Sequence, residues 1–229
     1  MALILNIETS TSVCSVSLSK NGNIIDIKES FEDKSHASLL TIFIQDLLKN
    51  NSIDATNLDA ISVSEGPGSY TGLRIGVSTA KGVCYAKSIP LIAINTMQSM
   101  ALMAKTKLKE SNMLFCPMID ARRMEVYSAL FNNDIKQIRK TIAEVIDNTS
   151  YNTELDKNKI AFFGDGANKC KQFIKHKNST FISNIYPSSN YMGIIAEKHF
   201  NKKEFKDVAY FEPFYLKDFV ATTPKKRMF

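Results

Sequence analysis

The arrangement of apolar and turn residues along the 229-residue chain predicts an α/β fold made of two related halves. In the first half, three consecutive strand patterns precede a helix, a further strand and a further helix, in the order β-β-β-α-β-α. A second strand hairpin, at 113–131, follows the lysine-rich segment 105–111. These observations divide the chain into residues 1–108 and 109–229. Few apolar residues follow the hairpin, which predicts a reduced second half.

Three strands open the first half, over residues 2–9, 13–20 and 23–30. Asn21 and Gly22 form a residue pair that tight hairpin turns favour. The segment 36–51 then has apolar residues at helical spacing, which form a wide stripe of Leu39, Leu40, Phe43, Ile44, Leu47 and Leu48. We expect this stripe mainly to cover the sheet, although part of it could stay exposed and dock a partner helix.

A glycine-rich turn links the strand at 58–64 to the helix at 75–87, and its main residues are Gly66, Pro67, Gly68, Ser69, Thr71 and Gly72. The glycines admit backbone conformations that a Cβ forbids, and Ser69 or Thr71 could cap the helix. Free N–H groups at a helix start could bind phosphate. No Gly-Lys-Ser/Thr follows, so the turn is not a P-loop. A tight turn with close helix packing is the stronger interpretation.

The remaining elements follow from the same kinds of pattern. A strand at 90–94 and a helix at 96–109 complete the first half. In the second half we expect strands at 113–121, 124–131 and 159–163, an irregular segment at 132–159 with one short helix near 142–146, a glycine turn at 164–168, helices at 169–177 and 188–200, a last strand at 212–216, and a mobile basic tail at 221–229. Asp120, Arg122 and Arg123 fall at the hairpin turn, where they could bind a substrate, although turns are normally polar.

The β-β-β-α-β-α unit is the repeat of the actin/hexokinase/Hsp70-like (ASKHA) fold, in which two halves face each other across a nucleotide cleft. The first hairpin of that fold often reads Asp-x-Gly-Thr/Ser and touches phosphate. Here the corresponding residues are Glu8, Thr9, Ser10 and Thr11. The longer carboxylate and the missing glycine argue against a working nucleotide site in this chain alone. The turn at Gly164 and Gly166 is the other place where nucleotide could bind.

Composition and charge place further limits on function. The chain is 44% hydrophobic and 23% charged, as is ordinary for globular proteins, and no apolar run approaches the ~20 residues of a membrane span. The start lacks a signal-peptide pattern, and the four cysteines are scattered, so we expect a cytoplasmic protein with reduced thiols. The net charge of +6 lies in the second half: residues 1–105 carry a net −1 and residues 106–229 a net +7. Any RNA contact would involve that half, although a plain lysine-rich surface is the stronger interpretation of this charge.

Catalytic motifs are missing from the sequence. No Gly-x-Ser-x-Gly or His-Glu-x-x-His occurs, and the sequence shows no recognisable set of catalytic residues. Catalytic relatives in the ASKHA superfamily carry a metal-binding His-x-x-x-His pair on the first helix. Here His36 is followed one turn later by Leu40, so we expect His36 to be a polar helix-start residue and the chain to bind no metal.

Several motifs resemble the TsaB (YeaZ) family, the bacterial partner proteins that help to make threonylcarbamoyladenosine on tRNA. The stretch 66–77 (Gly-Pro-Gly-Ser-Tyr-Thr-Gly-Leu-Arg-Ile-Gly-Val) resembles the family signature. Further similar stretches lie in order along the chain at 3–11, 14–18, 35–40, 120–127, 164–167 and 212–216. The resemblance covers nearly the whole chain and is weakest between residues 135 and 159.

The resemblance implies a non-catalytic subunit that pairs with and activates the catalytic paralogue TsaD and works with the ATPase TsaE. TsaD modifies N6 of adenosine 37 (t6A37) in tRNAs that read codons beginning with A, so this chain would meet tRNA indirectly. ATP and metal are expected on the partner subunits and no cofactor on this chain. The first two helices of the first half would form the interface, which singles out Leu40, Phe43, Leu47, Arg74, Gly76, Val77, Ala80, Lys81 and Cys84. The same helices could also form a homodimer. The alternative is a stand-alone ATP-dependent small-molecule kinase.

Overall fold

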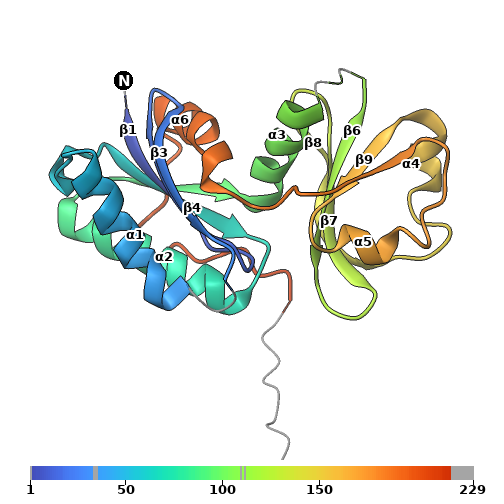
Figure 1. The fold of residues 1–229 in the computed structure, drawn as a ribbon, viewed down its shortest axis with the longest axis horizontal. Coiled ribbons are helices and arrows are strands. Elements are labelled where there is room, and N and C mark those ends of the chain that lie inside the picture. Colours follow the sequence, from blue (N-terminus) through green and yellow to red (C-terminus); the bar gives the residue numbers. More distant parts are fainter. Residues whose placement is uncertain (1, 33–35, 109, 111, 218–229) are drawn as a thin grey trace, which may run out of the picture.

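The computed structural model describes residues 2–32, 36–108, 110 and 112–217 and has two lobes, each built on a five-stranded sheet (Figure 1). The first sheet has the strand order β3-β2-β1-β4-β5, and the second has the matching order β10-β9-β6-β7-β8. This duplicated architecture is the predicted ASKHA fold. In the part of the chain that the structure describes, no helix is both long and apolar enough to cross a membrane.

The first sheet is formed by β1 (Leu3–Glu8), β2 (Cys14–Lys20), β3 (Asn23–Ser30), β4 (Ala60–Gly66) and β5 (Leu91–Asn95). β1 pairs antiparallel with β2 and parallel with β4, and β4 pairs parallel with β5. The helices α1 (His36–Asn50) and α2 (Tyr70–Lys87) pack on this sheet. All these elements lie where the sequence predicts them, and α2 begins five residues before the predicted start.

Side chains alternate between two buried environments along β2. Val16 and Leu18 join the core under α1 and α2, whereas Ser15 and Ser17 face the short 3-10 helix η2 (Ser189–Tyr191). The Ser15 hydroxyl receives a hydrogen bond from the backbone N–H of Ser189 at 3.0 Å, and the Ser17 hydroxyl donates to the Ser189 carbonyl oxygen at 3.0 Å. Buried serines are tolerated on this strand because they have partners.

The second sheet is formed by β6 (Leu114–Asp120), β7 (Glu125–Phe131), β8 (Gln137–Val145), β9 (Ile160–Phe163) and β10 (Ser179–Ile182). The prediction of an irregular segment at 132–159 with a helix near 142–146 is wrong, because β8 and α4 (Asn152–Lys157) occupy it. β8 lies at the sheet edge with Ile138 and Ile142 exposed, so it lacks the apolar pattern of a central strand. β10 was not predicted. The second half is therefore reduced in its helices and not in its sheet.

Three further predictions about the second half differ from the structure. The helix expected at 169–177 is only α5 (Ala167–Cys170), followed by turns. Residues 212–216 form no strand, because they lie against α2 and the end of β4 instead of pairing with a sheet. The helix expected at 188–200 is divided into η2 and α6 (Gly193–Asn201). The tail at 221–229 lies outside the described residues.

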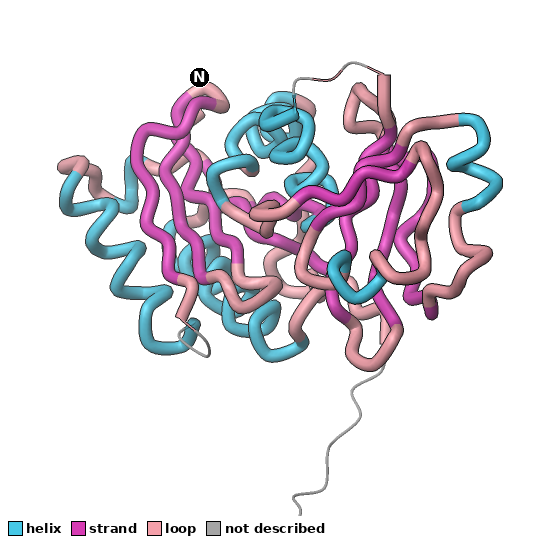
Figure 2. Tube along the Cα trace, turned by 45° about the vertical axis from the view of Figure 1, so that its right-hand side comes forward, coloured by secondary structure: helices cyan, strands magenta, loops and turns pink. Residues whose placement is uncertain are grey.

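The lobes exchange helices. The methionine-rich helix α3 (Thr96–Leu108) comes from the first half but packs its buried face on the second sheet, against Phe115, Phe131 and Phe163. In return, α6 packs on the first sheet, against Ile4, Ile92 and Ile94. Figure 2 shows the two groups of strands with helices between and around them. Since each lobe buries a helix from the other half, the two halves are held as one unit.

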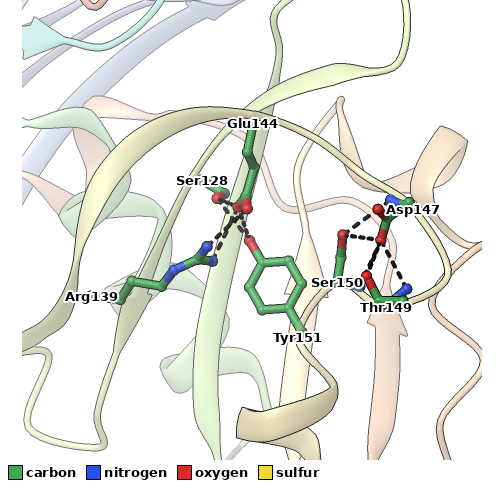
Figure 3. A network of polar contacts seen from close by, with 7 residues as sticks. All are labelled: Ser128, Arg139, Glu144, Asp147, Thr149, Ser150 and Tyr151. Atoms are coloured by element: carbon green, nitrogen blue, oxygen red, sulfur yellow. Dashed lines mark hydrogen bonds and ion pairs between the residues drawn. The ribbon is translucent and has the colours of Figure 1, made fainter.

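A buried polar network fixes β8 and the loop that follows it (Figure 3). The Arg139 guanidinium forms two hydrogen bonds with the Glu144 carboxylate, at 3.1 and 2.8 Å. The hydroxyls of Ser128 and Tyr151 both contact the same carboxylate, and the Tyr151 hydroxyl donates to that of Ser128 at 2.7 Å. Every charged group in this network has a partner, so its role is structural.

Candidate functional site

The glycine turn packs against the loop that joins β1 to β2. A Cβ on Gly68 would overlap the carbonyl oxygen of Ser10, and a Cβ on Gly72 would overlap that of Thr9. Gly76 has the same relationship with the Thr9 hydroxyl. The Thr9 hydroxyl also donates to the Gly72 carbonyl oxygen at 2.8 Å. These three glycines are therefore needed for close packing inside the chain.

The start of α2 uses several of its own N–H groups internally. Ser69 is the N-cap, and its hydroxyl accepts a hydrogen bond from the backbone N–H of Gly72 at 3.3 Å. The backbone N–H of Ser69 donates to the Ser10 carbonyl oxygen at 2.6 Å, and that of Leu73 donates to the Ser69 carbonyl oxygen. Groups bonded in this way are not free to hold a phosphate. The structure thus supports the interpretation that the glycine residues of this turn serve close packing of α2 against the β1–β2 loop.

Glu8 points into the protein. Its side chain is fully buried, and one carboxyl oxygen accepts a hydrogen bond from the backbone N–H of Ser10 at 2.7 Å. The other oxygen has no partner among the described residues. Burial raises the pKa of Glu8, and the hydrogen bonds to Ser10 and Ser64 offset only part of that effect. A carboxyl buried in this way is a poor ligand for a metal–phosphate group.

His36 is buried at the start of α1, and it joins three elements. Its Nε2 donates to the carbonyl oxygen of Thr11 at 2.6 Å, and its ring lies next to Gly72. The sequence predicted a polar helix-start residue, which is correct in position, but the side chain also fastens α1 to the β1–β2 loop. Among the described residues, no group of three or more His, Cys, Asp or Glu side chains is placed to hold a metal ion.

The hairpin turn of the second lobe is held by its own side chains. Lys169 donates to the carbonyl oxygens of Arg123 and Glu125, at 2.7 and 2.8 Å, and forms an ion pair with Asp120. Burial alone would raise the pKa of Asp120, but the Lys169 ammonium and the Arg122 N–H outweigh it and lower that pKa. Asp120 is thereby engaged within the turn, and the side chains of Arg122 and Arg123 are exposed.

Six of the nine predicted interface residues lie in the core. Leu40, Leu47, Gly76, Val77, Ala80 and Cys84 are all buried, and they pack against the first sheet or against the β1–β2 loop. The amphipathic stripe turns these side chains inward because the sheet offers the larger apolar surface. They can support an interface only by holding the helices in place.

The other three candidates are more accessible, and two of them bind a segment we call the C-terminal strap (residues 206–217). Lys81 donates to the carbonyl oxygens of Ala209 and Phe211, at 3.0 and 3.1 Å. Arg74 donates to the Tyr215 hydroxyl at 3.3 Å and lies 4.2 Å from the centre of the Tyr70 ring. Phe43 is half-buried and packs against the core.

Comparisons with known proteins identify the family. The model of the family described as "TsaD: tRNA N6-adenosine threonylcarbamoyltransferase" matches residues 30–225. A Haemophilus influenzae protein named "tRNA threonylcarbamoyladenosine biosynthesis protein TsaB" is 29% identical over 95% of this chain and 94% of its own length. The chain belongs to the TsaB (YeaZ) group of the TsaD family. The Escherichia coli protein of the same name is 35% identical over 57% of this chain and 55% of its own length.

The fold of the TsaB group is also found here. A solved Pseudomonas aeruginosa structure, described as an uncharacterized protein with similarity to peptidase YeaZ, aligns with a TM-score of 0.85. It is 21% identical in sequence, and the alignment covers 95% of this chain and all of that one. The two lobes and their connections thus have the same fold as that structure.

The exposed side chains of α1 and α2 were missed by sequence reasoning. Ile42 on α1 is 49% exposed and Tyr85 on α2 is 83% exposed, and both lie outside the predicted apolar stripe or interface set. Among the described residues, and apart from its chain neighbours and the nearby backbone of its own helix, Gly82 of α2 has no atom within 4 Å of where its Cβ would lie. A helical projection could have indicated Ile42, because this residue, which directly precedes Phe43, lies on the side of the helix away from the stripe.

Proposed function

We propose that this chain is a non-catalytic TsaB-type subunit that binds a TsaD-type transferase and activates it for t6A37 formation in tRNAs that read codons beginning with A. It works in the cytoplasm together with the ATPase TsaE and takes no cofactor of its own, so ATP and metal are held by its partners. It meets tRNA only through the assembled complex.

One observation carries this proposal: the β1–β2 loop and the glycine turn use their backbone groups on each other. Ser69 and Gly72 bond to Ser10 and Thr9, at the place where a nucleotide-binding relative would present N–H groups to phosphate. Glu8 is buried beside them instead of facing a ligand. A chain of this fold without an evident catalytic set is best explained as a binding subunit.

The exposed part of α1 and α2 supports the interface assignment. Ile42 and Tyr85 place two large side chains in solvent on neighbouring helices, and half-buried Leu39 and Phe43 lie close to Ile42 along α1. Aromatic and large apolar residues are the ones that dominate binding energy at protein interfaces. A stable complex needs about 1,000 Å² of buried surface, which two helices can supply.

The test is size-exclusion chromatography with light scattering of the chain alone and mixed with a TsaD-type transferase. We expect a 1:1 complex that Ile42→Asp weakens at least about tenfold, because a charge would be buried at the interface. The matched control is Ile138→Asp, a similarly exposed isoleucine on the second lobe at 53%, which should bind normally. No complex with the unaltered chain would contradict the proposal. Self-association through the same helices when the transferase is absent should also be lost in Ile42→Asp.

A further inference from the structure

A groove runs between the second half of α2 and the beginning of the C-terminal strap. It is lined by Lys81, Gly82 and Tyr85 on the helix and by Asp207, Val208 and Ala209 on the strap, and its volume is about 640 Å³. Helix α2 belongs to the first half of the chain, whereas the strap comes from its far end. The groove therefore exists only because the strap returns across the first lobe.

Packing among the described residues does not explain why Gly82, which lies in this groove, is a glycine. A glycine in a helix interior lowers stability relative to alanine. Gly76, on the same helix, is required because Thr9 occupies the space of its Cβ. Gly82 has only open space at the same position. A missing side chain on an exposed helix lets another backbone approach closely.

The strap wall of the groove is firmly attached. Lys206 donates its backbone N–H to the Leu91 carbonyl oxygen at 2.8 Å, and Phe214 donates to that of Glu65 at 2.7 Å. Between these anchors, Val208 and Phe211 pack against the core of the first lobe. Lys81 bonds to two strap carbonyl groups in the same interval. The strap thus has the contacts of a permanent wall.

Charges in the groove are already engaged, and one aromatic side chain lines it. The Lys81 ammonium is held by the two strap carbonyls, and the Asp207 carboxylate accepts the N–H groups of Ala209 and Tyr210 at 2.8 and 3.1 Å. Tyr85, on the helix wall, is 83% exposed. Such a groove suits a helix with an apolar face better than a charged peptide.

We propose that the strap is part of the surface that binds the transferase. A helix of the transferase lies in the groove with its backbone close to Gly82. Lys81 is a positioning residue that holds the strap. This inference rests on the proposed function and extends it from α1 and α2 to residues 207–209. It follows that the far end of the chain takes part in partner binding.

Gly82 provides the sharper test, because its variants should not impair folding. Gly82→Leu adds a good helix former in open space, so the free energy of unfolding should rise while affinity for the transferase falls at least about tenfold. Gly82→Ala should raise stability similarly and reduce affinity less. Affinity is measured by titration calorimetry, and stability by urea unfolding. If Gly82→Leu binds as tightly as the unaltered chain, the groove is not the docking site.

Lys81 tests the role of the strap. Lys81→Met keeps the apolar stem but removes both hydrogen bonds, and we expect weaker transferase binding with α2 still folded. Lys81→Arg can still donate hydrogen bonds to the carbonyls, so it should bind the transferase as the unaltered chain does. Lys140→Met, on the exposed edge of β8, is the control for the loss of one positive charge and should not weaken binding. Equal binding by Lys81→Met and Lys81→Arg would overturn the positioning role. Absence of binding by the unaltered chain would instead overturn the proposed function.

Discussion

The backbone N–H of Ser69 donates a hydrogen bond to the carbonyl oxygen of Ser10 at 2.6 Å. This bond joins the start of α2 to the loop after β1, which corresponds to the hairpin that touches phosphate in nucleotide-binding members of the ASKHA fold. In this chain the two places hold each other. The glycines between them allow that contact because a Cβ at Gly68 or Gly72 would displace the loop.

The first prediction concerns these glycines. Gly72→Ala should lower the free energy of unfolding by about 1–3 kcal/mol, because its Cβ would overlap the Thr9 carbonyl oxygen and the backbone must shift. Gly82→Ala, on the same helix with open space around it, should raise stability by about 0.5–1 kcal/mol. Urea unfolding of both variants measures the difference. Equal effects at the two positions would show that close packing is not the reason for Gly72.

The second prediction concerns ATP. Since Ser69 and Gly72 bond within the chain, the lone protein should show no ATP dissociation constant at or below about 1 mM in calorimetric titration with Mg²⁺. A nucleotide analogue without a hydrolysable γ-phosphate should behave in the same way. Saturable ATP binding that is lost in Ser69→Ala would contradict this prediction and support the kinase alternative.

The third prediction is a pH dependence due to Glu8. Burial raises its pKa in the folded chain, so the neutral acid is favoured there. The stability that it contributes is fully present below the unfolded pKa of about 4.3 and is lost as pH rises through the raised folded pKa. Glu8→Gln cannot ionise, so its free energy of unfolding should increase relative to the unaltered chain as pH rises from about 4 to about 8. Glu212→Gln, at an exposed position, controls for loss of one surface charge. A constant difference across this range would contradict the prediction.

The fourth prediction concerns the polar network of the second lobe. Tyr151→Phe removes a hydroxyl that contacts both Ser128 and Glu144, and leaves their buried polar groups short of a partner. We expect a loss of about 1–3 kcal/mol in the free energy of unfolding. Tyr210→Phe removes the hydroxyl of a tyrosine that is 86% exposed, so it should change stability little. A double-mutant cycle with Ser128→Ala should reveal coupling between the two hydroxyls. Additive losses would mean that the hydroxyls act independently.

The sequence by itself determined most of the first half. The strands β1 to β5, both covering helices and a cap at Ser69 or Thr71 follow from local patterns, because side-chain periodicity and turn residues act within a few positions. The edge strand β8 was not predicted from such local patterns. It is half exposed, and its polar residues Arg139 and Glu144 find partners in each other and in Tyr151, which no local pattern encodes.

Only the tertiary structure decided which residues are available to a partner. Leu40, Leu47 and Val77 are apolar helix residues, as is Ile42, but the position of the sheet buries the first three and leaves the last exposed. Likewise, the sequence around Arg74 does not indicate its partner, because Tyr215 lies far along the chain and only the fold places it next to Arg74. Accessibility depends on contacts between distant segments, and those contacts are set by packing of the whole chain.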